Sequence, residues 1–223
     1  MQKSRIEWTD MSWNPIRGRC PVKCKLPDGQ VYCYGHRHYD MRPWLEEGTG
    51  DVGVLVEHEL EQPMARKKPT KIFVCSTFEL FYHRHGFYRD PIFKTIEACP
   101  QHTFQILTKM PENIYRPMPE NVWLGVSVTN HNDVFSRYEG LLAAKARVKF
   151  ISFEPLLECT WYLPTRIDWA IIGKLSGYGK KYDPSKALLK RMVREFKFSK
   201  VPVFLKNNLK DIWGENLIQE WPK

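Results

Sequence analysis

The sequence lacks any uninterrupted apolar run of the roughly 18 residues that a membrane-spanning helix needs. Its first ten residues are polar and mixed in charge, without the apolar stretch of a secretory signal peptide. Internal repeats and low-complexity tracts are also missing. We therefore expect a cytoplasmic protein that has no membrane partner.

Cysteine is too sparse and too unevenly placed for a disulfide scaffold, with six residues in a chain of 223. Cys75, Cys99 and Cys159 each lie in or beside an apolar segment, which is typical of buried core thiols. Cys20, Cys24 and Cys33 instead lie close together. Clustered cysteines in a reducing compartment more often bind a metal than form disulfides.

What the sequence does contain is enough apolar material for one folded domain and an excess of basic residues. Hydrophobic residues make up 43% and aromatic residues 13% of the chain, so we expect a single domain over residues 1–223. The formal net charge of +9 favours an anionic partner such as nucleic acid, or is simply a solvated basic surface. Basic clusters lie at Arg66–Lys68 and between Lys180 and Lys200.

Short apolar runs alternate with helical patterns along most of the chain, apart from an irregular excursion at about 42–70 that includes an edge strand at Val52–Val56. Strands alternating with helices predict an α/β fold with parallel strands, either a partial or a complete TIM-type barrel, whose chemistry gathers at the carboxyl ends of the strands. The expected strands are Met11–Asn14, Ile72–Cys75, Phe104–Leu107, Val122–Val128, Phe150–Ser152, Trp169–Gly173 and Val201–Leu205. The expected helices are Pro91–Ala98, Asn132–Ala144 and Ser185–Phe196.

The cysteine loop is one ligand short of an ordinary four-cysteine metal site. Three thiolates on a 4Fe-4S cluster would leave one iron open for a small molecule. Alternatively, His36 or His38 would complete a Cys3His zinc site. Spacing alone is compatible with an iron–sulfur cluster, with a zinc site and with cysteines that bind no metal.

Several motifs follow one another along the chain: Ile6-Glu7-Trp8-Thr9-Asp10 with Trp13-Asn14-Pro15, Ile72-Phe73-Val74 with Ser76, Gln101–Lys109, Asn121–Val128, and Phe150-Ile151-Ser152 with Glu154–Leu157. Together they resemble a radical-SAM-like family that is often phage-encoded and related to spore photoproduct lyase-like proteins. The resemblance covers about residues 4–206, and several motifs in the right order are more specific than any one of them.

Two departures from that family pattern matter. The second gap between cysteines is eight residues where radical SAM loops usually have two, as if Lys25–Gln30 were an inserted turn. The family's usual G-G-E-S-G at the end of the sixth strand is replaced by Gly173-Lys174-Leu175-Ser176-Gly177. The loss of the acid indicates a different substrate or a lost activity.

The resemblance implies a 4Fe-4S cluster on Cys20, Cys24 and Cys33 and reductive cleavage of S-adenosylmethionine (SAM). The resulting 5′-deoxyadenosyl radical would abstract hydrogen from an unknown substrate, for which nucleic acid or a nucleotide is the candidate. A flavodoxin or ferredoxin would supply the electron. The implied SAM-binding residues are Tyr32, Ser76, Glu79, Ser127, Thr129, Asn130 and Glu154. Lys109 and Lys206 are candidate substrate-binding residues.

Each of these roles has an ordinary structural alternative. Asn130, for example, could simply cap the following helix. Cys75 is a weak candidate hydrogen-atom donor, with core packing as the other reading. For the whole chain, the alternatives to a radical SAM enzyme are a zinc-bound module that binds nucleic acid and a family member without catalysis.

Overall fold

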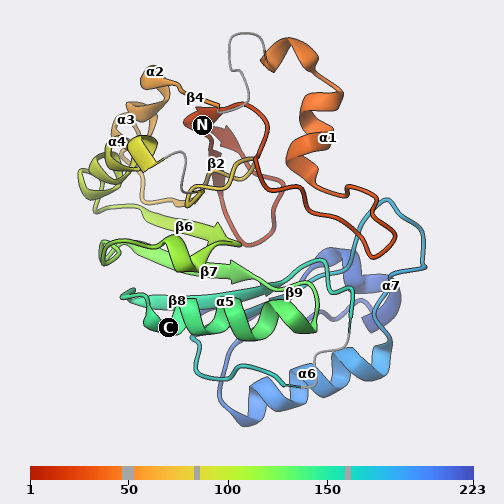
Figure 1. Cartoon of the computed structure of the whole chain (residues 1–223). Coiled ribbons are helices and arrows are strands. Elements are labelled where there is room, and N and C mark those ends of the chain that lie inside the picture. Colours follow the sequence, from red (N-terminus) through yellow and green to blue (C-terminus); the bar gives the residue numbers. More distant parts are fainter. Residues whose placement is uncertain (47–52, 83–85, 159–161) are drawn as a thin grey trace. The chain divides into compact units, whose positions relative to one another are not determined.

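The computed structural model describes residues 1–46, 53–82, 86–158 and 162–223. Residues 47–52 of the expected excursion and Cys159 lie outside the described residues. The chain forms two compact units, which are described separately (Figure 1). The first comprises Met1–Asn113 and Pro119–Val122, and the second comprises Ile114–Met118 and Trp123–Lys223. The expectation of one domain stays a prediction.

In the first unit, four strands are neighbours in the order β1-β2-β5-β6. The β2–β5 and β5–β6 pairs are parallel, whereas β1 is antiparallel to β2. The strands are β1 (Gln2–Lys3), β2 (Met11–Trp13), β5 (Lys71–Val74) and β6 (Thr103–Thr108). β5 is connected to β6 through α4 (Gly86–Glu97), which gives the expected βαβ order.

The opening sequence motif has a structural role in this unit. The Trp8 ring packs on Phe73 with centroids 4.9 Å apart, and Trp13 packs on Phe104 at 5.9 Å. Asp10 accepts a hydrogen bond from the backbone N–H of Lys71 at 2.8 Å. These contacts fix the segment that leads into β2 against β5 and β6, so the motif specifies packing around the start of the sheet.

The chain between β2 and β5 makes short elements. β3 (Ile16–Arg17) pairs antiparallel with β4 (Val54–Leu55), so β4 supplies the edge strand expected near Val52–Val56. The helical pieces of this segment are α1 (Tyr34–Asp40), η1 (Pro43–Glu46), α2 (Glu57–Leu60) and α3 (Gln62–Ala65). A 3-10 turn, η4 (Pro111–Asn113), follows β6.

The second unit contains four further strands, in the order β7-β8-β9-β10. All three pairs are parallel. The strands are β7 (Val122–Ser127, whose first residue belongs to the first unit), β8 (Val148–Phe153), β9 (Trp169–Ile172) and β10 (Val203–Leu205). Helices α5 (His131–Ala143) and α6 (Lys186–Phe198) lie in the connections, and η5 (Asn207–Leu209) and α7 (Lys210–Trp213) follow β10.

The C-terminal segment covers the outer edge of β10. Leu205 donates its N–H to Ile218, Glu220 donates its N–H to Val203, and Phe204 bridges antiparallel to Gln219. Trp221 stacks on the buried Trp169 at 5.0 Å between ring centroids. The β10 edge is therefore paired with the chain's own terminal segment.

The predicted α/β class with mostly parallel strands is confirmed, and each expected strand has a counterpart within a few residues. The described strands of neither unit close into a barrel. α4 begins at Gly86, five residues before the expected start at Pro91. Pro91 therefore lies inside the helix and does not mark its first turn. No described helix is long and apolar enough to cross a membrane.

Candidate functional site

A small hairpin brings the second and third cysteines of the loop back to one place. Lys25 bridges antiparallel to Val31, and Tyr32 donates its N–H to the carbonyl of Cys24 at 3.0 Å. At the tip, Gly29 has a φ of 87°, a left-handed conformation that favours glycine. The eight-residue gap therefore folds out as the expected turn, and Cys24 and Cys33 lie side by side at its base.

The thiols of Cys24 and Cys33 are within hydrogen-bonding reach and behave as one acid–base pair. The hydrogen bond from Cys24 lowers the pKa of Cys33 to about 5, and the charges of His36 and Lys109 act in the same direction. The pKa of Cys24 is raised, first by this hydrogen bond and then by burial. The opposite directions of the two pKa shifts favour Cys33 over Cys24 as the thiolate of the pair.

Cys20 is the third thiol of the loop. It interacts electrostatically with both Cys24 and Cys33, and burial raises its pKa to about 11. Cys75, at the end of β5, interacts electrostatically with Cys20 and is fully buried, which raises its pKa. Its φ of 53° is unusual for a residue other than glycine. Cys75 and Cys99 are buried, as predicted for core thiols.

The Cys24–Cys33 pair predicts an unusual pH profile for alkylation of the metal-free protein. Thiolate is the reactive form, so Cys33 should react with iodoacetamide at a nearly constant rate above about pH 6 and slow as the pH falls through about 5. Replacing Cys24 with alanine removes the hydrogen bond and should move this midpoint upward by at least about one pH unit. Peptide mass spectrometry of samples alkylated after a pH jump measures the rate at Cys33 and so gives this midpoint. An unchanged midpoint in Cys24→Ala would contradict the pairing.

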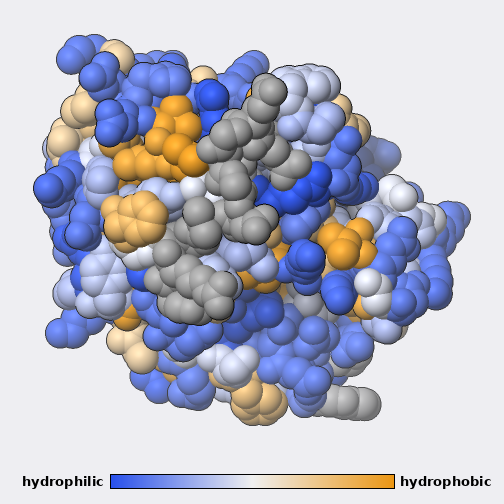
Figure 2. Space-filling model, turned by 45° about the horizontal axis from the view of Figure 1, so that its top comes forward, coloured by the Kyte–Doolittle hydropathy of each residue, from blue (hydrophilic) through white to orange (hydrophobic). Residues whose placement is uncertain are grey.

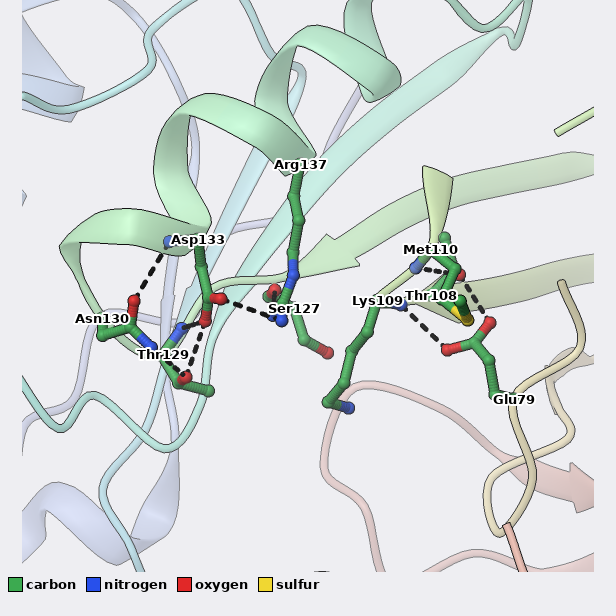
Figure 3. Close-up of polar contacts among 9 residues, drawn as sticks. All are labelled: Glu79, Thr108, Lys109, Met110, Ser127, Thr129, Asn130, Asp133 and Arg137. Carbon is green, nitrogen blue, oxygen red and sulfur yellow. Dashed lines mark hydrogen bonds and ion pairs between the residues drawn. The ribbon is translucent and has the colours of Figure 1, made fainter. Parts of the chain in front are cut away.

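Glu79 is a buried carboxylate whose two oxygens are both held by the chain (Figure 3). Oε1 accepts from the Thr108 hydroxyl at 2.5 Å and from the N–H of Phe81 at 3.1 Å. Oε2 accepts from the N–H of Lys109 at 2.9 Å. Glu79 thereby ties the loop after β5 to the end of β6, and its predicted role in binding SAM stays a prediction.

Three other predicted residues of this unit lie in or near the cysteine loop and the loop after β5. The Ser76 hydroxyl donates to Asn14 Oδ1 at 3.1 Å, which links the loop after β5 to the Trp13-Asn14-Pro15 motif. Tyr32 lies in the hairpin directly before Cys33 and is half-buried. Lys109 lies near Cys24 and Cys33 and favours their thiolate forms. The structure therefore brings Lys109 to the cysteines, a placement that spacing in the sequence did not predict.

In the second unit, the residues after β7 form a network with α5 (Figure 3). Thr129 donates its hydroxyl to Asp133 Oδ2 at 2.7 Å, and the Asn130 side chain accepts from the Asp133 N–H at 3.0 Å. Asn130 is therefore the N-cap of α5. Arg137 pairs with Asp133 at 2.8 Å and donates to the carbonyl of Ser127 at 2.5 Å. Asp133 and Arg137 were missed in the sequence, although their i,i+4 spacing was a visible signal.

The ends of β8, β9 and β10 meet at a second polar cluster of this unit. Lys206 Nζ donates to Glu154 Oε1 at 2.5 Å in a partly buried ion pair. A Cβ built at Gly173 would lie 3.0 Å from Glu154 Cδ and 3.0 Å from Lys206 Cδ. Glycine at position 173 therefore leaves room for the ion pair to sit over the end of β9.

Lys174 and Leu175, which replace Gly and Glu of the radical-SAM-like pattern, help to line a shallow depression of about 510 Å³ in the second unit. Leu175 is buried, whereas Lys174 pairs with Asp183 at 2.8 Å and with Asp211 at 2.6 Å. Burial alone would lower the pKa of Lys174, but the two carboxylates outweigh it and raise the pKa. The positive charge of Lys174 is thus balanced by two carboxylates of the second unit.

The cysteine loop offers the ligand type of an iron–sulfur cluster, because it carries three thiols and the hydrogen bond from Cys24 lowers the pKa of Cys33. Within the described ranges, no group of three or more Cys, His, Asp or Glu side chains lies so that it could hold a metal ion. His36 Nε2 lies 2.8 Å from the carbonyl oxygen of Cys20, which leaves Nδ1 as its atom for a metal.

Comparison with known families matches residues 3–218 to a family described as "Protein of unknown function (DUF5131)". The chain belongs to this family. No curated protein and no solved structure matched it. The DUF5131 match spans the cysteine loop and both units, but its description carries no activity. The chemistry of the site itself is therefore what indicates the function of this DUF5131 member.

Proposed function

We propose that this protein is a radical SAM enzyme whose 4Fe-4S cluster is held by Cys20, Cys24 and Cys33. The observation that carries the proposal is the hairpin at Lys25–Val31, which brings Cys24 and Cys33 into contact despite their long separation in sequence. When bound, the cluster and SAM would supply one-electron cleavage chemistry at an iron that the three thiolates leave open.

The residues around the thiols fit this role. Thiolates are the ligands of iron–sulfur clusters, and the charges of Lys109 and His36 favour ionisation of Cys33. Cys20 lies in a buried environment, which limits access of water to this side of the loop. Glu79 anchors the neighbouring loop through its three hydrogen bonds and so keeps the surroundings of Cys20 in place.

The order of strands and helices within each unit is compatible with the partial TIM-type barrel of this proposal. Ser127, Thr129 and Glu154 at strand ends are proposed SAM contacts, and Lys206 a proposed substrate contact. The net charge of +9 supports nucleic acid or another anion as substrate and an acidic electron donor such as flavodoxin or ferredoxin.

One observation favours a second candidate, a structural zinc site without catalysis. His36 lies close enough to influence Cys33, and its Nε2 is engaged with a backbone carbonyl, which is the usual second contact of a metal-binding histidine. A Cys3His site with zinc on Nδ1 would make the loop a structural clip.

Product analysis tests the proposed function. The protein is reconstituted with iron and sulfide under anaerobic conditions, reduced with dithionite and incubated with SAM, and 5′-deoxyadenosine and methionine are quantified by chromatography. Formation of both in equal amounts supports the proposal, and Cys33→Ala treated identically is the control. A protein that carries one zinc and forms neither product would support the structural clip instead.

A further inference from the structure

The outward face of α6 carries a linear array of cations. Lys186, Lys190, Arg194 and Lys197 are all exposed, whereas Leu189, Met192, Val193 and Phe196 are buried. At 100° and 1.5 Å per residue, the four cations fall within one narrow stripe about 16 Å long. We call these four residues the α6 stripe (α6 is labelled in Figure 1).

Most of the α6 stripe is not neutralised by the protein. No carboxylate among the described residues forms an ion pair with Lys186, Lys190 or Arg194. Lys197 lies 3.9 Å from Glu220, a long contact between two partly exposed side chains. The single acid of the helix, Glu195, is paired with Arg191, which lies outside the stripe. The stripe therefore presents a positive potential to solvent.

An aromatic side chain extends this surface at the end of the helix. Phe198 is 89% exposed, and Lys200, two residues later, is also exposed. A fully exposed phenylalanine is costly in water, since its ring is among the largest apolar groups. An aromatic ring beside a row of cations is the combination with which proteins hold single-stranded nucleic acid, by stacking on bases and pairing with phosphates.

We propose that α6 binds single-stranded nucleic acid, with the α6 stripe along the phosphates and Phe198 stacked on a base. A linear row of charges complements a linear polyanion. A membrane surface fits less well, because a helix that lies in a bilayer needs an apolar face turned outward, and the apolar face of α6 is buried in the second unit. On the face drawn in Figure 2, hydrophilic residues surround a few separate hydrophobic patches. This proposal does not depend on the metal or on SAM.

The test uses the full-length protein and a fluorescein-labelled oligonucleotide of about 16 nucleotides, with anisotropy measured over a range of salt. The test variant carries Lys186→Gln, Lys190→Gln and Arg194→Gln. Each lost phosphate contact removes about 0.7 from the slope of log K against log salt for a single strand. We expect a slope smaller by about 2 and an affinity about 100-fold weaker at ~0.1 M salt.

The matched control removes the same charge elsewhere, with Lys3→Gln, Arg5→Gln and Lys94→Gln, all exposed in the first unit and outside its basic cluster. It should keep the slope of the parent protein to within about 0.5. Phe198→Ala should weaken binding about fivefold or more and leave the slope unchanged. Circular dichroism confirms that each variant is folded.

Four results would overturn the proposal or its single-strand part. One is equal loss of binding in the test variant and its control, and another is no binding of the parent protein at ~0.1 M salt. The third is co-sedimentation with phosphatidylserine vesicles without binding to the oligonucleotide, which would assign α6 to membranes. Equal affinity for a duplex, with no effect of Phe198→Ala, would contradict the single-strand assignment.

Discussion

Replacing Cys24 or Cys33 with alanine should abolish retention of iron after anaerobic reconstitution. Both cysteines lie at the base of the same hairpin, and their thiols form one acid–base pair. Removing either leaves two of the three proposed thiolates, too few to hold a cluster in this loop. We expect iron and sulfide contents to fall by at least about tenfold relative to the parent protein.

Cys99→Ala is the matched control for this prediction. Cys99 is a buried thiol of the same unit, with its pKa raised by burial, and it belongs to the core. It should retain the full iron content of the parent protein. Iron and acid-labile sulfide assays on all variants provide the measurement, and equal iron in Cys24→Ala and Cys99→Ala would contradict the assignment of the ligands.

Replacing Glu79 with alanine should lower the free energy of unfolding by about 3–5 kcal/mol. The side chain is 5% exposed and accepts three hydrogen bonds, all from the chain. Its removal would leave the Thr108 hydroxyl and the N–H groups of Phe81 and Lys109 buried without this acceptor. Urea unfolding followed by circular dichroism measures the change.

Glu120→Ala is the control, because Glu120 is an exposed carboxylate of the same unit. It should change the free energy of unfolding by less than about 0.5 kcal/mol. Replacing a structural anchor lowers the free energy of unfolding even in the absence of any cofactor, whereas replacing a residue that only binds SAM does not. Equal stabilities of Glu79→Ala and Glu120→Ala would therefore restore a purely ligand-binding role.

The parallel strands were predictable because each is a short apolar run between turn residues. A strand that is buried on both faces does not need to alternate apolar with polar residues. β9, with the sequence Trp169–Ile172, is wholly buried and shows this plainly. α1 was not predictable in the same way. Its residues, Tyr34–Asp40, include only one large buried apolar side chain, Tyr39, and so carry no apolar stripe.

The site was predictable to the extent that its chemistry is local in sequence. The hairpin between Cys24 and Cys33 follows from Pro27, Asp28 and Gly29, which are turn residues; the structure shows Asp28 accepting from the N–H of Gln30. The contacts of Glu79 with Thr108 and Lys109 join segments about 30 residues apart. No local pattern encodes such a pairing, since it depends on the neighbouring positions of β5 and β6.

The most direct test of the proposed open iron site is electron paramagnetic resonance of the reconstituted, dithionite-reduced protein with and without SAM. The account predicts a brown protein whose reduced 4Fe-4S signal shifts when SAM is added, because SAM binds the iron that the three cysteines leave free. A colourless protein with one zinc, or a cluster signal that SAM leaves unchanged, would contradict it.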